Sequence, residues 1–162
     1  MTYDRAKAIS YALKWWNSRN PLFYDFENIG GDCTNFVSQC LLYGGLKMHY
    51  NEWFFRSINH RSPSWSGVNE FCSFLLTNQV ETSPIGVLSS ISQVTEGDIV
   101  QLTLGGHSTF HHSMLITKIN HEKEPSNRTF DDIFITCHTV DAKNVMLSAY
   151  DIKDIRFIKI MN

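Results

Sequence analysis

Apolar positions along this chain follow a helical period in its first half and a strand period in its second half. The helical spacing predicts three amphipathic helices, whose apolar stripes cover 9–16, 36–41 and 68–76. Asp4 is the expected N-cap of the first helix. The Asn20-Pro21 pair is expected to end that helix, and Gly44 is expected to end the second one.

The period changes after residue 94. Val100, Leu102 and Leu104 alternate with polar residues, which predicts a half-buried strand with its polar side chains outside the core. Further strands are expected over 111–119, 132–140 and 155–161. Helices followed by an antiparallel sheet predict an α+β fold, in which the second helix packs against the sheet.

The segment 46–66 follows neither period but contains several aromatic residues, among them Trp53 and Trp65. Two interpretations are open. The aromatic side chains either line the rim of a substrate-binding cleft or belong to an irregular loop over the core.

Composition adds limits to this picture. A chain of 162 residues, 43% of them hydrophobic, fits one domain over 1–162 and is too short for two ordinary ones. The 14 basic and 16 acidic residues give a net charge of -2, so neither nucleic acid nor an anionic membrane is an expected partner. The composition does not determine an oligomeric state.

The compartment is expected to be the cytoplasm. The N-terminal residues lack the apolar stretch of a secretory signal, and no window approaches the ~18 apolar residues of a membrane span. The four cysteines form no C-x-x-C pair, so we expect reduced thiols.

One cysteine stands in a special local context. Gly30 and Gly31 permit a tight turn that delivers Cys33 to the first turn of the second helix. The positive end of the helix dipole is expected to favour its thiolate, which makes Cys33 a candidate nucleophile. Its backbone N–H is the expected oxyanion donor, and the Tyr24 side chain is a candidate second donor.

A histidine would complete this chemistry. Successive strand residues point to opposite faces, so only one of His111 and His112 can face the cysteine. A zinc site made of these two and His107 is not expected, because the segment is not helical and no carboxylate lies near it in sequence. We therefore expect no metal and no cofactor.

The motifs together resemble a known family. Gly-Gly-Asp-Cys-Thr-Asn-Phe-Val-Ser-Gln at 30–39, His112-Ser113 and His138-Thr139-x-Asp141 are similar to the bacterial putative amidase-domain family. That family is related in layout to the NlpC-type papain-like cysteine peptidases. The resemblance implies a papain-like fold and acyl transfer through a thioester on Cys33.

The resemblance also selects His112 as the residue that takes the thiol proton and returns it to the leaving group. It implies His138 as the group that orients the imidazole. Asp141 is the alternative, because a carboxylate is the better electrostatic partner for an imidazolium. Both remain candidates for the third catalytic position.

Three functions are compatible with these residues. Discharge of the thioester by water gives an amidase or peptidase acting on a peptide-like or acyl substrate. Discharge by an amine gives an amide-forming acyltransferase, which fits a carrier-bound acyl group in a bacterial natural-product pathway. The third possibility is a non-catalytic binding module on the same scaffold.

Overall fold

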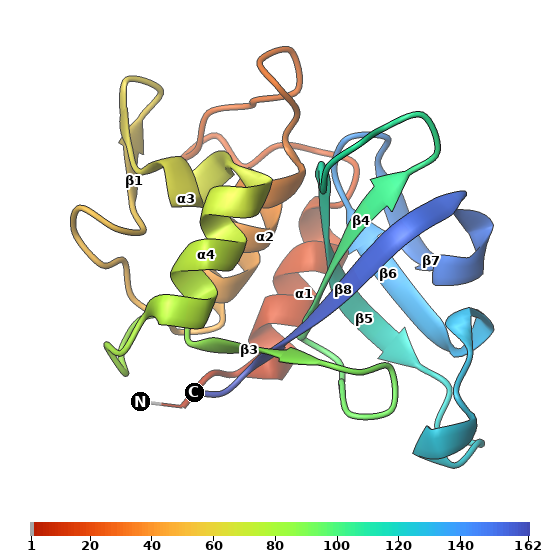
Figure 1. Ribbon diagram of the computed structural model, residues 1–162. Coiled ribbons are helices and arrows are strands. Elements are labelled where there is room, and N and C mark those ends of the chain that lie inside the picture. Colours follow the sequence, from red (N-terminus) through yellow and green to blue (C-terminus); the bar gives the residue numbers. More distant parts are fainter. Residues whose placement is uncertain (1) are drawn as a thin grey trace.

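The computed structural model describes residues 2–162 and places helices against one face of a six-stranded antiparallel sheet (Figure 1). This arrangement confirms the expected α+β class. In chain order the helices and strands are α1 Arg5–Trp15, α2 Cys33–Tyr43, β1 Phe55–Ser57, β2 His60–Arg61, α3 Pro63–Ser66, α4 Val68–Thr77, β3 Gly86–Ser89, β4 Ile99–Leu104, β5 His112–Ile119, β6 Ile133–Cys137, β7 Ala142–Met146 and β8 Ile152–Ile160. Short 3₁₀ turns cover Pro125–Asn127, Phe130–Asp132 and Leu147–Ala149.

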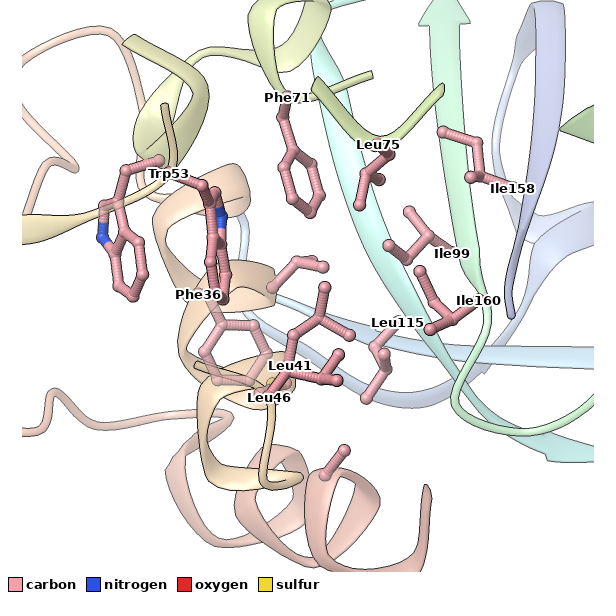
Figure 2. Packing of buried hydrophobic residues seen from close by; sticks show 14 of the residues in the cluster. Phe36, Leu41, Leu46, Trp53, Phe71, Leu75, Ile99, Leu115, Ile158 and Ile160 are labelled. Carbon is pink, nitrogen blue, oxygen red and sulfur yellow. The ribbon is translucent and has the colours of Figure 1, made fainter. Parts of the chain in front are cut away.

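The sheet has the strand order β3-β8-β4-β5-β6-β7. Its two faces carry separate hydrophobic cores, because successive strand residues point to opposite sides. Leu115 on β5 belongs to the core under the helices, whereas its neighbour Met114 belongs to the core on the other face. Figure 2 shows the first of these cores, where Phe36 and Leu41 of α2 lie near Leu115.

The first helix ends earlier than the sequence predicts. Asp4 is its N-cap, as expected, and the Asp4 carboxylate accepts a hydrogen bond from the Lys7 backbone N–H at 3.0 Å. The helix ends at Trp15 rather than at Asn20. The Trp15 carbonyl accepts hydrogen bonds from the Ser18 backbone N–H at 3.2 Å, in a tighter turn, and from the His138 ring at 2.7 Å.

The sheet is larger than the sequence analysis expected. Strands β3 and β7 were missed, as were the short β1 and β2 and the α3 turn within 46–66. The third expected strand ends at Cys137 instead of residue 140, because Thr139 and Val140 adopt left-handed φ angles of 62° and 53°. A strand cannot continue through that conformation.

The polar positions of β4 correct a second expectation. Gln101 and Thr103 are buried instead of solvent-facing. Their face of the sheet is the one that the helices cover, and the Gln101 amide donates a hydrogen bond to the Val68 carbonyl at the start of α4. Alternation of apolar and polar residues therefore does not mark an exposed face in this strand.

Trp53 and Trp65 are fully buried in the core under the helices, which corrects their assignment to the rim of a cleft. The Trp53 indole N–H donates to the Ser38 hydroxyl at 3.1 Å, and the Trp65 N–H donates to the Asn35 side-chain oxygen at 2.8 Å. Because α2 satisfies both polar groups, the two large rings can be buried completely.

Within residues 2–162, no helix has the length and apolar character needed to cross a membrane.

Candidate active site

Cys33 is the first residue of α2, as the sequence predicts. The two glycines before it have left-handed φ angles of 84° and 99°, which side chains with a Cβ rarely adopt. A Cβ at Gly31 would also come within 3.2 Å of the Thr139 hydroxyl oxygen. The glycine pair therefore both permits the turn and lets the β6–β7 turn approach the start of α2.

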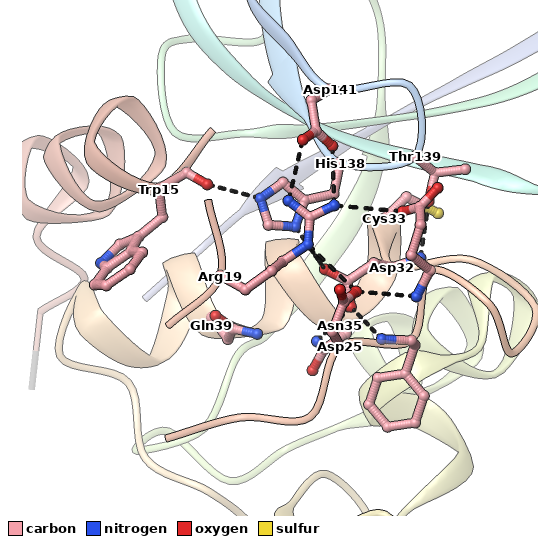
Figure 3. A network of polar contacts seen from close by, with 12 residues as sticks. Trp15, Arg19, Asp25, Asp32, Cys33, Asn35, Gln39, His138, Thr139 and Asp141 are labelled. Carbon is pink, nitrogen blue, oxygen red and sulfur yellow. Dashed lines mark hydrogen bonds and ion pairs between the residues drawn. The ribbon is translucent and has the colours of Figure 1, made fainter. Parts of the chain in front are cut away.

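The carboxylate of Asp32 holds this helix start in place (Figure 3). One oxygen, Oδ1, accepts hydrogen bonds from the Phe26 backbone N–H and from the Asn35 side-chain amide, both at 2.8 Å. The other, Oδ2, lies 2.5 Å from Nδ1 of His138. Asp32 is fully buried, and these contacts connect the preceding loop, α2 and the end of β6.

His138 uses both of its ring nitrogens in this network. Its Nε2 donates to the Trp15 carbonyl at 2.7 Å, and its ring stacks on Phe36 with centroids 3.9 Å apart. The Nε of Arg19 lies 3.6 Å from the same Oδ2 of Asp32. Both ring nitrogens of His138 therefore lie within hydrogen-bond distance of oxygen atoms, Oδ2 of Asp32 and the Trp15 carbonyl.

Asp141 lies at the outer edge of the same network. Its two carboxylate oxygens accept hydrogen bonds from two nitrogens of the Arg19 guanidinium, each at 3.1 Å. Arg19 also contacts Asp25 at 3.3 Å, so it ties the loop after α1 to the turn after β6. Among the hydrogen bonds of residues 2–162, none joins His138 or Asp141 to the His112 ring.

The sulfur of Cys33 lies against the beginning of β5. The thiol donates to the His111 carbonyl oxygen at 3.8 Å, and the Thr34 hydroxyl lies 3.9 Å from the sulfur. Burial raises the pKa of the Cys33 thiol, and hydrogen bonds from the Ser113 backbone N–H and the Thr34 hydroxyl offset this only in part. The expectation of an easily formed thiolate is therefore corrected, since desolvation outweighs the helix start.

The backbone of His112 lies directly beside this sulfur, because the sulfur contacts the carbonyl before it and the N–H after it. The side chain is 5% exposed. Burial and the neighbouring His111 lower the pKa of His112 to about 4, so the ring is neutral at pH 7. A neutral imidazole is the form that can accept a thiol proton.

The His112 ring itself makes no hydrogen bond within the described part of the chain. Residues alternate along β5, and Ser113 faces α2, where its hydroxyl lies 2.8 Å from that of Thr34. The His112 ring therefore starts on the opposite face, with its centroid 6.4 Å from that of Tyr150. Proton transfer would require this ring to turn toward the sulfur at the end of the strand.

The two candidate oxyanion donors, the Cys33 backbone N–H and the Tyr24 side chain, lie in different surroundings. The Cys33 N–H, as the first of its helix, has no intrahelical partner. The Tyr24 ring is 39% exposed and packs edge-on against Phe26, with centroids 5.1 Å apart. Its backbone carbonyl accepts from the Asn35 amide at 2.9 Å, which fixes the loop to α2.

Three features of this site escaped the sequence analysis: the pairing of Asp32 with His138, the contact of Ser113 with Thr34, and the burial of Gln101. Asp32 and His138 are 106 residues apart, so no local period relates them. The sequence feature that could have indicated this pairing is the His138-Thr139 motif. In the fold, Thr139 lies against Gly31 and Asp32.

These features define an α+β protein with a buried cysteine at the start of a helix, whose sulfur contacts the backbone on both sides of a neutral, buried histidine. The chain belongs to the family described as "Putative amidase domain", whose model matches residues 2–161. It is similar to "Uncharacterized protein YhbB" of Bacillus subtilis (strain 168), with 32% identity over 119 residues. That match covers 70% of this chain and 37% of the relative, so the chain spans little more than a third of the relative's length. No solved structure matches.

Family membership indicates amide hydrolysis as the class of reaction.

Proposed function

We propose that this domain hydrolyses an amide bond by covalent catalysis, with Cys33 as the nucleophile and His112 as the general base, on a papain-like fold. The contact of the Cys33 sulfur with the backbone on both sides of residue 112 is the observation that carries this proposal. The contact brings the thiol to the backbone of a residue 79 positions away, where α2 and β5 are joined by a hydrogen bond. A turn of the His112 ring toward the sulfur would complete the pair.

The reaction needs few groups. His112 takes the thiol proton while the sulfur attacks the carbonyl carbon of the substrate, and the Cys33 backbone N–H donates to the oxyanion that forms. The C–N bond then breaks, the leaving amine takes the proton from His112, and a thioester remains on Cys33. Water attacks the thioester with His112 again as the base, which releases a carboxylic acid and restores the thiol.

The state of the two groups fits this sequence of steps. Burial raises the pKa of Cys33 and lowers the pKa of His112, so the resting pair is a thiol and a neutral imidazole. Such a pair transfers its proton during the attack and does not exist as a preformed ion pair. Cys33 is only 4% exposed, so we propose a substrate whose reacting acyl group is slender and peptide-like.

The test is release of amine from a panel of N-acyl amino-acid amides and short peptides by wild type, Cys33→Ala and Cys72→Ala. Cys72 is a buried thiol on α4 and serves as the matched control. We expect Cys33→Ala to lose at least about 10³-fold in rate and Cys72→Ala to retain activity. Full activity in Cys33→Ala would reject the proposal.

Intact-mass analysis complements the rates. We expect an acyl adduct on wild type that is missing from Cys33→Ala, because a thioester needs the sulfur. The same reactions with an added amine such as glycine amide identify the acceptor. Hydrolysis products alone support the amidase, and a new amide product would support the acyltransferase.

A further inference from the structure

A line of buried polar side chains crosses the sheet and ends at the Cys33 sulfur. It begins at Arg156 on β8, continues through Gln101 on β4 and Ser113 on β5, and reaches Thr34 on α2. Gln101 is the direct cross-strand partner of both Arg156 and Ser113, so the sheet register itself aligns them. Gln101, Ser113 and Thr34 are all fully buried.

The direction of every hydrogen bond in this line is determined. A guanidinium can only donate, so the Arg156 Nε donates to Oε1 of Gln101 at 2.7 Å and fixes the orientation of the amide. The two hydrogens of the Gln101 amide nitrogen then go to the Val68 carbonyl and to the Ser113 hydroxyl, each at 3.0 Å. Ser113 is therefore an acceptor from Gln101.

The hydroxyl hydrogens of Ser113 and Thr34 can be assigned by the same count of donors and acceptors. The Ser113 hydroxyl has no acceptor among residues 2–162 other than Thr34, whose Oγ1 lies 2.8 Å away, so it donates to Thr34. Having accepted that bond, the Thr34 hydroxyl has its own hydrogen free for the Cys33 sulfur at 3.9 Å. The thiol hydrogen in turn goes to the His111 carbonyl at 3.8 Å.

We propose that Gln101, Ser113 and Thr34 are positioning residues for the nucleophile, which keep one O–H donor permanently directed at the Cys33 sulfur, with Arg156 setting the direction. This inference rests on the proposed function, because it assigns a role to the neighbours of that same sulfur. The donor stabilises the thiolate as the proton leaves, and it keeps a sulfur lone pair in a fixed direction.

Arg156 is suited to this role. Among the ion pairs of residues 2–162 it has none, and its guanidinium stacks on the Phe110 ring at 4.0 Å and donates to Asn69 at 3.0 Å. Without a carboxylate to satisfy it, the guanidinium is held over the sheet by these neutral contacts. Its charge therefore acts on the Gln101 amide through a direct hydrogen bond, with Asp154 as the neighbouring acidic group.

Other titratable groups also face the sulfur and must be kept constant in a test. They are Asp32 before it in the chain, Cys137 on β6, and His111 and His112 at the start of β5, whose backbone lies beside the sulfur. Around Arg156 the corresponding groups are Asp154 and Cys72. The informative substitutions are therefore neutral and nearly isosteric, since they change the hydrogen bond and leave all these charges in place.

The experiment measures the rate of Cys33 alkylation by iodoacetamide against pH, with the modified peptide quantified by mass spectrometry. Thr34→Val removes the donor, Thr34→Ser keeps it, and Thr117→Val is the matched control on the same face of β5, hydrogen-bonded to Thr136 instead. We expect the midpoint of the alkylation rate against pH to rise by about one pH unit in Thr34→Val. The same midpoint should not change in Thr34→Ser or Thr117→Val. An unchanged midpoint in Thr34→Val would overturn the proposal.

Two further variants interrupt this chain of hydrogen bonds by substitutions outside α2. Ser113→Ala and Gln101→Met leave the Thr34 hydroxyl present but undirected, so both are expected to raise the midpoint by a smaller amount than Thr34→Val. If neither shifts the midpoint in folded protein, the line does not act on the sulfur. Failure of the proposed function would give a different result. Cys33→Ala would then hydrolyse amides at the wild-type rate, whatever the pH profile of alkylation.

Discussion

His112 begins β5 and His138 follows directly after the neighbouring strand β6, and the structure uses these two histidines in opposite ways. His138 is held at both nitrogens, by Asp32 at 2.5 Å and by the Trp15 carbonyl at 2.7 Å. His112 is buried with its backbone beside the sulfur and has no hydrogen bond to its ring within the described chain, and burial and His111 lower its pKa to about 4. The base must have a free nitrogen, which His138 lacks.

The comparison bears on the third catalytic position, for which the family resemblance implied His138. A ring with both nitrogens bonded elsewhere can orient Asp32, but it has no donor or acceptor left for His112. We therefore expect His138 to act on the start of α2 and to affect catalysis only through the position of Cys33. The following predictions separate the two histidines.

The largest effect is expected from His112→Ala. Loss of the base should lower kcat/KM by about 10²–10⁴-fold, with the folded state retained, because the ring makes no hydrogen bond within the described residues. Rates on the amide panel and a thermal melt would be measured together. A variant with wild-type rates would remove His112 from the mechanism and end the contrast with His138.

His138→Ala is expected to act first on stability. Removing the ring takes away the 2.5 Å partner of Oδ2 in the buried Asp32 carboxylate, which costs about 3 kcal/mol. Urea unfolding measures this loss. An unchanged unfolding free energy together with a rate loss as large as that of His112→Ala would show that His138 is the catalytic orienter after all.

The pH dependence of activity sharpens the comparison. The pKa of His112 lies at about 4 in the folded protein, below the ordinary 6.5, because burial disfavours the charged ring. The acid limb of kcat/KM should therefore fall near pH 4, whereas an unperturbed histidine would place it near 6.5. A limb near 6.5 would mean that another group is the base.

The same pKa predicts a trend in stability. Between pH 6.5 and 4 the unfolded chain binds a proton at residue 112 and the folded protein does not, so the His112 contribution to the unfolding free energy falls as the pH falls. Urea unfolding at several pH values would show this slope in wild type. His112→Gln should reduce the slope, since it removes the titrating ring.

The smallest effect is expected from Asp141→Asn. The carboxylate pairs with Arg19 near the surface, with side-chain exposures of 29% and 25%, and such pairs contribute about 0.2–1 kcal/mol. Rates on the amide panel should change by less than about threefold. A much larger loss of rate, with the stability intact, would return Asp141 to the catalytic site.

Local sequence was sufficient for several parts of this protein. It determined the helix that begins at Cys33, the left-handed glycines before it, the cap at Asp4 and the α+β class, and the Gly-Gly-Asp-Cys motif pointed to the matched family. Each of these depends on neighbours within a turn or two, because side-chain periods and backbone sterics act over that range.

Tertiary structure decided how those parts meet. Only the fold pairs Asp32 with His138, buries Trp53 and Trp65 against α2, and places Gln101 between Arg156 and Ser113. These contacts depend on strand register and on which face the helices cover. Neither is encoded in the local pattern of apolar and polar residues, since a shift of one residue would present a different set of side chains to the sulfur.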